Sequence, residues 1–309
     1  MDSLSSLTPV EVAELLKITK NTVYELIKRG ELPSYKVGKK IRVDIKDVEE
    51  YINSQKTGKI KDTQFNNKNI SINNNFKVII SGQDVILDIL ARSVEKKLDG
   101  VNTFRSYIGS YNALYELYNS RVSIASSHLW DFETDEYNST FVKKLLPGIP
   151  CVLINLAYRM QGFYVAKGNP KEIKAWKDLT RPNITLVNRE KGAGTRVLLD
   201  GKLRLLNFNG SHIKGYDNEE LSHLGVASTV SRGIADVGLG NEKAALQVNN
   251  IDFIPLHKER YDLVIKKEDL QNPVYQIIIN IINSAEFKAE LQGLGGYDLT
   301  DTGKIIAEV

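Results

Sequence analysis

Residues 8–52 read TPVEVAELLKITKNTVYELIKRGELPSYKVGKKIRVDIKDVEEYI, and their caps and apolar spacing point to a compact helical unit. Thr8 stands before Pro9, a residue favoured at the first helical position, and Glu11 completes a capping box. Thr19 offers a second N-cap shortly afterwards. The spacing therefore predicts two short helices separated by a tight turn, a helix-turn-helix.

A hairpin and a third helix are predicted after the helix-turn-helix. Gly30 follows Lys28-Arg29, as is typical of a helix that ends in a left-handed glycine. The segment SYKVGKKIRVD (34–44) places a Gly-Lys-Lys turn between two short strands, which predicts a basic β-hairpin, or wing. A third short helix is expected over residues 47–51.

Positive charge in this unit is concentrated on the second helix and the wing. Residues 1–53 carry nine basic and nine acidic side chains, but residues 17–42 carry eight basic and two acidic ones. Neutralisation of phosphates supplies most sequence-independent affinity for DNA, so this concentration of charge predicts DNA binding. The alternative is that the basic residues form the solvated face of a protein-interaction domain. The residues expected to contact double-stranded DNA are Lys20, Asn21, Thr22, Tyr24, Lys28, Arg29, Lys39, Lys40 and Arg42.

Nearly all of residues 6–52 resembles the excisionase-type winged helix-turn-helix related to the MerR group. The resemblance implies that the second helix enters the major groove and that the wing contacts the backbone or the minor groove. It leaves open whether the chain regulates transcription or recombination.

The composition of the whole chain is typical of a globular protein. It has 309 residues, 42% of them hydrophobic and 26% charged, with no apolar run near the ~18 residues that span a bilayer. The N-terminal sequence has no apolar signal region, so we expect a cytoplasmic protein without membrane contact. The single cysteine, Cys151, excludes an internal disulfide and fits a reducing compartment. Net charge is +3, so contact with nucleic acid requires local segregation of charge.

The chain is expected to contain a helix-turn-helix domain over 1–53, a flexible linker over 54–75 and a larger domain over 76–309. The linker is rich in Lys, Asn, Ser and Gln, whereas strand-length apolar runs alternate with helical patterns from residue 76 onward. This alternation predicts an α/β domain with parallel sheets covered on both faces. The apolar runs at 151–158 and 252–256 are candidates for crossovers between two lobes.

Small polar residues follow several of the predicted strands of the larger domain. They form three clusters: Ser81-Gly82-Gln83, Ser126-Ser127-His128 and the segment 192–196, Gly-Ala-Gly-Thr-Arg. Ligands of α/β sheets bind at such carboxyl ends of strands, and the helix N-termini there favour anions. The sequence therefore predicts an anion site, although an ordinary glycine turn with a solvated Arg196 is the alternative reading of the third cluster.

Residues 76–309 resemble the molybdate-binding-protein-like domain, a relative of type II periplasmic solute-binding proteins. The resemblance rests on GFYVAKGNPKEIKAWKDL (162–179), VNREKGAGTRVLLD (187–200), HLGVASTVSRGIADVGLG (223–240) and IDFIPLHKERYDLVI (251–265). It implies one lobe of about 76–154 plus 257–309, a second lobe of about 155–256, and closure of the two on a tetrahedral oxyanion. The ligand contacts that it implies are Ser81, Ser126, Ser127, Thr195 and Arg196.

Signals for catalysis are weak. The four histidines have no metal-ligand spacing, the single cysteine removes thiolate zinc sites, and the Gly-Ala-Gly-Thr segment lacks the lysine of a P-loop. We expect neither an enzyme nor a bound metal or cofactor. The leading hypothesis is a one-component transcription regulator, a homodimer or higher oligomer, that senses an oxyanion of the molybdate or tungstate type. An excisionase-like architectural protein with a non-sensing assembly domain, and an enzyme on a binding-protein fold, remain the alternatives.

Overall fold

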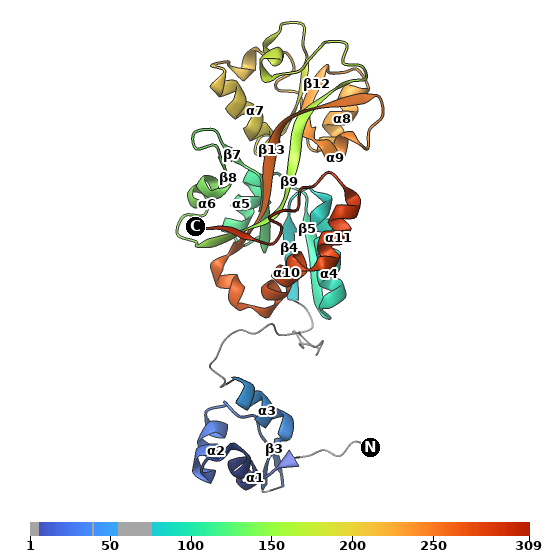
Figure 1. The fold of residues 1–309 in the computed structure, drawn as a ribbon. Helices are drawn as coiled ribbons and strands as arrows, with labels where there is room; N and C mark the ends of the chain where they lie inside the picture. The colour runs from blue at the N-terminus through green and yellow to red at the C-terminus, as the bar shows by residue number, and fades with distance from the viewer. Residues whose placement is uncertain (1–5, 39, 55–75) are drawn as a thin grey trace. The chain divides into compact units, whose positions relative to one another are not determined.

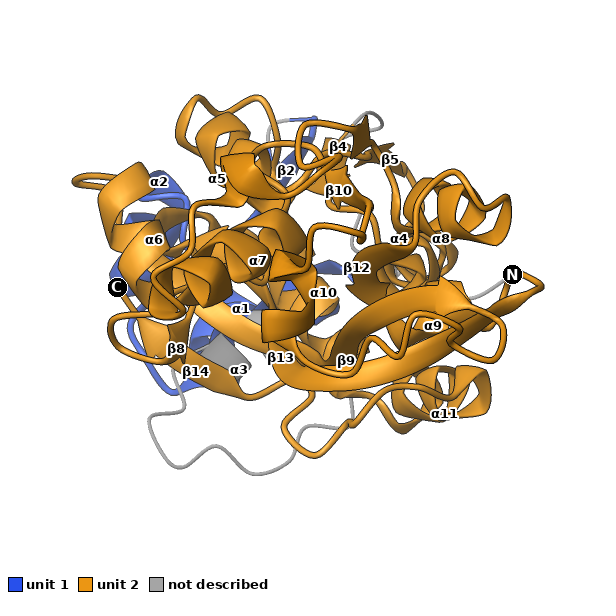
Figure 2. Cartoon of the chain, turned by 90° about the horizontal axis from the view of Figure 1, so that it is seen from above, with its two compact units in different colours: residues 1–67 blue, residues 68–309 orange. Residues whose placement is uncertain are grey.

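The computed structural model describes residues 6–38, 40–54 and 76–309, which belong to two compact units, residues 1–67 and 68–309 (Figure 2). The predicted linker over 54–75, apart from its first residue, lies outside the described residues, and so does Lys39 of the predicted wing.

The N-terminal unit has the predicted helix-turn-helix and hairpin. Thr8 accepts a hydrogen bond from the backbone N–H of Glu11, and Thr19 accepts one from the N–H of Thr22. Gly30 has a φ of 75°, which confirms the left-handed helix end. A short strand that the sequence did not predict, β1, pairs with the hairpin. The elements are β1 (Ser6–Leu7), α1 (Pro9–Leu16), α2 (Lys20–Lys28), β2 (Tyr35–Val37), β3 (Lys40–Asp44) and α3 (Ile45–Ser54).

The larger unit is an α/β structure built on one long mixed sheet (Figure 1). Its strands are β4 (Phe76–Ser81), β5 (Val101–Ser106), β6 (Ile124–Ser127), β9 (Cys151–Ala166), β10 (Leu186–Arg189), β11 (Glu219–Glu220), β12 (Val237–Asn241), β13 (Ile251–Lys266) and β14 (Ile305–Glu308). The short strands β7 (Trp130–Asp131) and β8 (Glu136–Tyr137) form a separate pair.

The helices of the larger unit follow its strands. They are α4 (Val85–Lys97), α5 (Ser110–Tyr118), α6 (Ser139–Leu145), α7 (Gly194–Leu205), α8 (His223–Ser231), α9 (Glu242–Ala245), α10 (Pro273–Asn283) and α11 (Ala285–Leu294). Short 3-10 turns cover Trp176–Thr180, Gly210–His212 and Lys267–Gln271.

The prediction of parallel sheets is only partly right. β4 is parallel to β5 and β6, and β10 is parallel to β11 and β12. β9 and β13, however, run antiparallel to each other and to their other neighbours β12 and β6. The reason is that the chain passes between the lobes twice, in opposite directions, and each passage is a strand rather than a helical crossover.

β9 and β13 are the connection between the lobes. Each is 16 residues long, and they pair along their length, side by side in both views (Figures 1 and 2). The segments 151–158 and 252–256, predicted as crossovers, each lie within one of these continuous strands.

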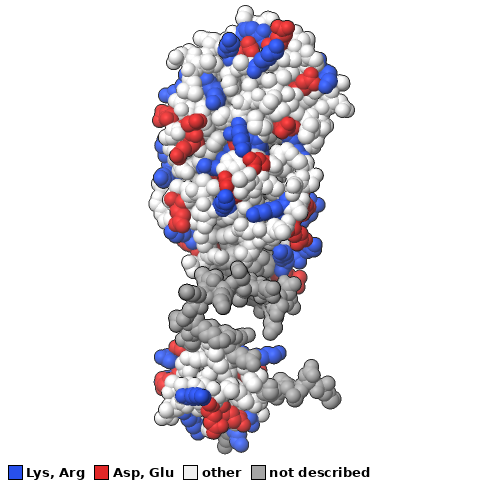
Figure 3. All heavy atoms as spheres, viewed as in Figure 1, with Lys and Arg blue, Asp and Glu red and all other residues white. Residues whose placement is uncertain are grey.

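Each lobe has its own hydrophobic core. Buried side chains of β4, α4, α10 and α11 form one cluster, and those of β10, β12 and α7 form another. Because apolar burial is the main stabilising contribution to folding, two cores joined by two strands leave the lobes able to move relative to each other. The described residues contain no helix that is both long and apolar enough to cross a membrane. Figure 3 shows basic and acidic side chains interspersed over the visible face of this unit.

Candidate functional site

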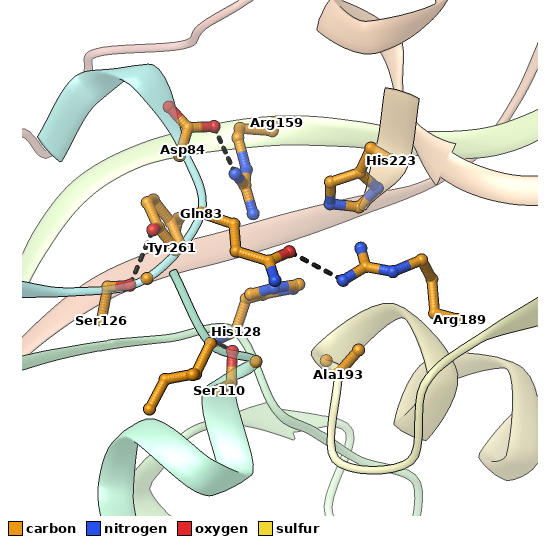
Figure 4. A pocket seen from close by; sticks show the side chains of 14 residues that line it. Gln83, Asp84, Ser110, Ser126, His128, Arg159, Arg189, Ala193, His223 and Tyr261 are labelled. Carbon is orange, nitrogen blue, oxygen red and sulfur yellow. Dashed lines mark hydrogen bonds and ion pairs between the residues drawn. The ribbon is translucent and has the colours of Figure 1, made fainter. Parts of the chain in front are cut away.

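A small polar pocket lies between the two lobes (Figure 4). Its free volume is about 20 Å³, little more than one water molecule requires. Strand ends, helix N-termini and both crossover strands contribute to it. The lining residues are Gly82, Gln83, Asp84, Ile108, Gly109, Ser110, Ser126, His128, Arg159, Arg189, Ala193, Gly194, His223 and Tyr261.

Four helices begin at this pocket. Asp84 and Gly109 are the N-caps of α4 and α5 from the first lobe, Ala193 is the N-cap of α7 from the second, and His223 is the first residue of α8. Gly109 and Ala193 give their helices no side-chain cap. The N–H of Ser110 in α5 and the first N–H groups of α7 thus remain for a ligand, whereas the N–H of Tyr111 donates to Gly192, and the helix dipoles add positive potential. This arrangement favours an anion.

Arg159 brings a buried cation to the pocket from the middle of β9. Its side chain is 4% exposed, forms ion pairs with Asp84 and Glu259, and stacks 3.9 Å above the ring of Tyr261. Burial would lower the pKa of Arg159, but the two carboxylates raise it, so the guanidinium stays charged. Its Nε atom has no hydrogen-bond partner among the described residues, whereas Nη2 contacts the Glu259 carboxylate. Arg159 therefore keeps donor capacity inside the site.

Arg189 is the second cation and lies at the end of β10. It is buried, and its Nε and Nη2 atoms donate to the Glu190 carboxylate at 2.8 Å. Nη2 also donates across the cleft to Oε1 of Gln83 at 2.7 Å. Neighbouring carboxylates thus hold both arginines in place: Asp84 and Glu259 hold Arg159, and Glu190 holds Arg189.

Hydroxyl and imidazole groups complete the lining. Ser126 and Tyr261 share a hydrogen bond of 2.7 Å, and His128 Nδ1 lies 2.8 Å from the Glu259 carboxylate. His223 Nδ1 has no hydrogen-bond partner among the described residues. Burial, followed by the charges of Arg189 and Arg159, holds the pKa of His223 well below its usual value, so this imidazole is neutral at pH 7.

The lobes are in contact around the pocket, so the structure is the closed form. The N–H of Tyr111 donates to the carbonyl of Gly192 at 3.0 Å across the cleft. A Cβ at Gly109 would lie 2.9 Å from the Cα of Ala193, and a Cβ at Gly194 would lie 2.6 Å from the ring of His128. Glycine is required at both positions because the backbone of Gly109 lies against the backbone of Ala193, and the backbone of Gly194 lies against the ring of His128.

Of the five residues expected to bind the ligand, Ser126 lines the pocket. Ser81 and Ser127 are fully buried at the ends of β4 and β6, and their hydroxyls have no partner within the described residues. Thr195 is buried in the first turn of α7, where its hydroxyl donates to Oε1 of Gln161 at 3.4 Å. Ser81, Ser127 and Thr195 lie next to the lining residues rather than among them.

Arg196, which was also expected to bind the ligand, is not among the residues that line the pocket. Its guanidinium pairs with Asp200 at 3.1 Å and Glu219 at 3.0 Å and stacks on Tyr216 at 4.2 Å. It also donates to the carbonyl of Arg189. Arg196 thus stabilises the strand end that carries Arg189, and Arg189 is the arginine of this segment that reaches the pocket.

The sequence contained weak signals for the residues that were missed. Arg189 directly follows the apolar run of a predicted strand, the position already expected for ligand contacts. Arg159 is a charged residue within the otherwise largely apolar strand β9, and Glu259 of β13 faces it in register. A charge in such a buried strand requires a partner, which is itself a signal of a site.

The predicted DNA-contacting residues lie mostly on exposed positions of α2 and the hairpin. Lys20, Asn21, Tyr24, Lys28, Arg29 and Lys40 are exposed, and Arg42 is partly buried. Thr22 is exposed, but its hydroxyl lies 2.9 Å from that of Thr19 in the helix cap. Arg29 pairs with Glu31 at 3.1 Å. Lys20 lies over the ring of Tyr24, 5.8 Å from its centroid.

Among the residues that the structure describes, no group of three or more His, Cys, Asp or Glu side chains is arranged to hold a metal ion. Cys151 is buried at the start of β9, and burial raises the pKa of its thiol to about 11. Such a thiol is a poor nucleophile.

Each of the two units matches the model of a known protein family. Residues 91–283 match the model of the PBP superfamily domain, and residues 6–56 match a helix-turn-helix domain. The uncharacterized protein YvgK of Bacillus subtilis (strain 168) is 43% identical over the full length of both chains.

Proteins with named ligands match part of the larger unit. The sulfate-binding protein of Salmonella typhimurium is 28% identical over 161 residues, 47% of this chain and 48% of that protein. The molybdate-binding protein ModA of Mycobacterium bovis is 33% identical over 120 residues, 38% of this chain and 42% of that protein. The chain thus spans less than half the length of these binding proteins.

Solved structures share the fold of the larger unit. A phosphate ABC transporter substrate-binding protein from Clostridium perfringens, described as putative and holding phosphate, aligns with a TM-score of 0.53 and 18% identity, over 72% of this chain and 98% of that one. A tungstate ABC transporter structure from Geobacter sulfurreducens aligns with a TM-score of 0.53 and 14% identity, over 70% and 98% of the two chains.

Proposed function

Because this chain belongs to the PBP superfamily and carries a helix-turn-helix domain, we propose that it is a one-component DNA-binding regulator that responds to a small oxyanion. The observation that carries the proposal is the pocket between the lobes, where Arg159, Arg189 and the uncapped N-termini of α5 and α7 converge. A regulator of this kind acts in the cytoplasm, where its operator lies.

The donor-rich lining supports a fully deprotonated oxyanion. Arginine side chains and helix N–H groups can only donate, and the carboxylate of Asp84 already accepts from Ile86, Tyr297 and Arg159. Hydrogen phosphate carries its own proton and needs an acceptor, for which the neutral imidazole of His223 is the candidate, whereas molybdate, tungstate and sulfate need donors alone. We therefore expect molybdate, tungstate or sulfate to bind more tightly than phosphate, with molybdate or tungstate as the proposed effector. The names of the sulfate- and molybdate-binding relatives support this ligand class.

Calorimetry and thermal unfolding test the ligand. Titration of the full chain with molybdate, tungstate, sulfate and phosphate should give saturable binding of at least one of them. That anion should raise the melting temperature, because a ligand that binds the folded state alone stabilises it. Absence of binding by all four, with the protein folded, would contradict the oxyanion proposal. DNA binding without any anion effect would favour the architectural alternative.

The DNA-binding part of the proposal is tested separately. Lys40→Ala should weaken binding to all DNA sequences alike and reduce the slope of log affinity against log salt by about one phosphate contact. Asn21→Ala should instead reduce discrimination between operator and random DNA, since Asn21 lies at the N-terminal end of α2. Lys97→Ala removes an exposed lysine from the ligand-binding unit and is the matched control.

Ligand control of DNA binding requires a difference between the open and closed lobes. An anion shifts that equilibrium only by the difference between its affinities for the two forms. We propose that closure changes the spacing of the helix-turn-helix units in a homodimer, whose half-sites would be about one helical turn apart. Analytical ultracentrifugation and gel-shift titrations with and without the anion test this step. A monomer that binds the operator tightly would contradict it.

A further inference from the structure

Gln83 points into the pocket from the loop between β4 and α4 (Figure 4). Its carboxamide reaches the opposite lobe with both ends. Oε1 accepts from Arg189 Nη2 at 2.7 Å, and Nε2 donates to the carbonyl of Leu221 at 3.1 Å. Gln83 therefore connects the two lobes with two hydrogen bonds at the position where an anion oxygen would meet Arg189.

The small size of the pocket is consistent with the Gln83 side chain filling space that an anion would need. With the Gln83 side chain in place, the free volume is about 20 Å³, close to the space of one water molecule. A tetrahedral oxyanion has five heavy atoms and needs more room. A ligand that takes the Nη2 donor of Arg189 must therefore displace the carboxamide.

We infer that Gln83 is an internal surrogate ligand, which latches the lobes together in the absence of an anion and competes with the anion for Arg189. The inference rests on the proposed oxyanion site and adds how that site is controlled. A neutral amide oxygen on an arginine makes a weaker bond than an oxyanion, since bonds between two ionised groups are the stronger class. The latch is thus strong enough to populate a closed form and weak enough to be displaced.

The latch also sets the threshold of the response. Molecules in the latched form cannot bind the anion at Nη2 of Arg189, so the apparent affinity equals the intrinsic affinity multiplied by the unlatched fraction. Removal of the carboxamide should therefore open the ligand-free protein and tighten anion binding at the same time. A residue that only helps to hold the ligand would have the opposite effect on affinity.

The test measures lobe closure and anion affinity independently in the full chain. Spin labels on Asn119→Cys and Leu205→Cys, near the far ends of α5 and α7, report the distance between the lobes. Cys151 is buried and can stay in place. The variants are Gln83→Ala, Gln83→Glu and, as the matched control, Gln247→Ala, which removes an exposed glutamine of the second lobe.

Gln83→Ala should lengthen the ligand-free distance between the labels and tighten anion binding about threefold to tenfold, the effect of about one net hydrogen bond. Gln83→Glu should keep the lobes closed without ligand and weaken anion binding at least about tenfold, because its carboxylate forms a charged pair with Arg189. Gln247→Ala should match the wild type in both measurements.

An unchanged ligand-free distance in Gln83→Ala would overturn the latch, whatever anions bind. Weaker anion binding by Gln83→Ala would overturn the competition and make Gln83 a ligand-holding residue. If neither wild type nor Gln83→Ala binds any of the four anions, the proposed oxyanion function fails, and the distance measurement still decides whether the latch exists.

Discussion

Arg159 of β9 and Glu259 of β13 face each other at the point where the two crossover strands pass the pocket, and their side chains form a buried ion pair. Glu259 also lies 2.8 Å from His128 of the first lobe. Burial would raise the pKa of Glu259, but the charges of Arg159 and His128 lower it, so the carboxylate is ionised. One buried acid thus positions a cation and an imidazole of the site.

Glu259→Gln should destabilise the ligand-binding unit by about 1.5–3 kcal/mol, because Arg159 and His128 lose an ionised partner while Asp84 still pairs with Arg159. Urea unfolding followed by tryptophan fluorescence measures this, since both tryptophans, Trp130 and Trp176, lie in this unit. The control is Glu308→Gln, whose exposed ion pair with Lys267 should contribute almost nothing. Equal stability of the two variants would contradict a structural role for the buried pair.

Arg189→Met should lower the affinity for the bound oxyanion about tenfold to a hundredfold, the range expected for loss of a hydrogen bond to a charged group. Glu190 is then left near the surface, 15% exposed, so the fold should survive. Calorimetry gives the affinity, and circular dichroism checks the fold. Arg181→Met, a change to a more exposed arginine of the same lobe, should bind like the wild type. Unchanged binding by Arg189→Met would place the anion elsewhere.

Gly109→Ala should hold the lobes apart. The added methyl group would meet backbone atoms of Ala193 and Gly192 at 2.9–3.0 Å, and backbone atoms cannot move aside as a flexible side chain can. Such overpacking costs about 1–3 kcal/mol in the closed form alone, so anion affinity should fall about tenfold and the distance between lobe labels should increase. Gly293→Ala, with open space around its Cα, is the control. Normal closure of Gly109→Ala would show that the contact is not tight in solution.

The stability of the ligand-free protein should fall as the pH decreases through about 6.5, in part because of His223. The pKa of this group in the folded protein is lowered well below 6.5 by burial and by the two arginines. Between the folded and unfolded pKa values the unfolded chain binds a proton that the folded chain does not, so acid favours unfolding. One such group contributes up to about 1.4 kcal/mol per pH unit.

Urea unfolding of wild type and His223→Gln between pH 7.5 and 5.5 measures this contribution. The difference in stability between the two proteins should shift in favour of the variant as the pH falls. His212→Gln, which removes an exposed histidine of the same lobe, is the matched control. A difference that does not vary with pH would show that His223 is not held neutral by its surroundings.

The elements of the N-terminal unit could be predicted from the sequence because their determinants are local. Thr8 and Thr19 cap helices through N–H groups three residues away, and Gly30 ends a helix by its own backbone conformation. Alternation of strands and helices likewise predicted the α/β class and the strand ends near Ser81, Ser126 and Arg189. Such features depend on residues that are close in the chain, so they can be recognised from one sequence without its tertiary structure.

The composition of the pocket was decided by tertiary structure. Gln83 and Arg189 are 106 residues apart and meet because the lobes close. Arg159 and Glu259 meet because two strands that are distant in sequence pair in one register. Arg196 was expected in the pocket from its place in the loop, but Asp200, one helical turn further along α7, and Glu219 hold its side chain elsewhere. Sequence position located the strand ends, whereas the competition between possible charge partners in three dimensions determined which arginine faces the ligand.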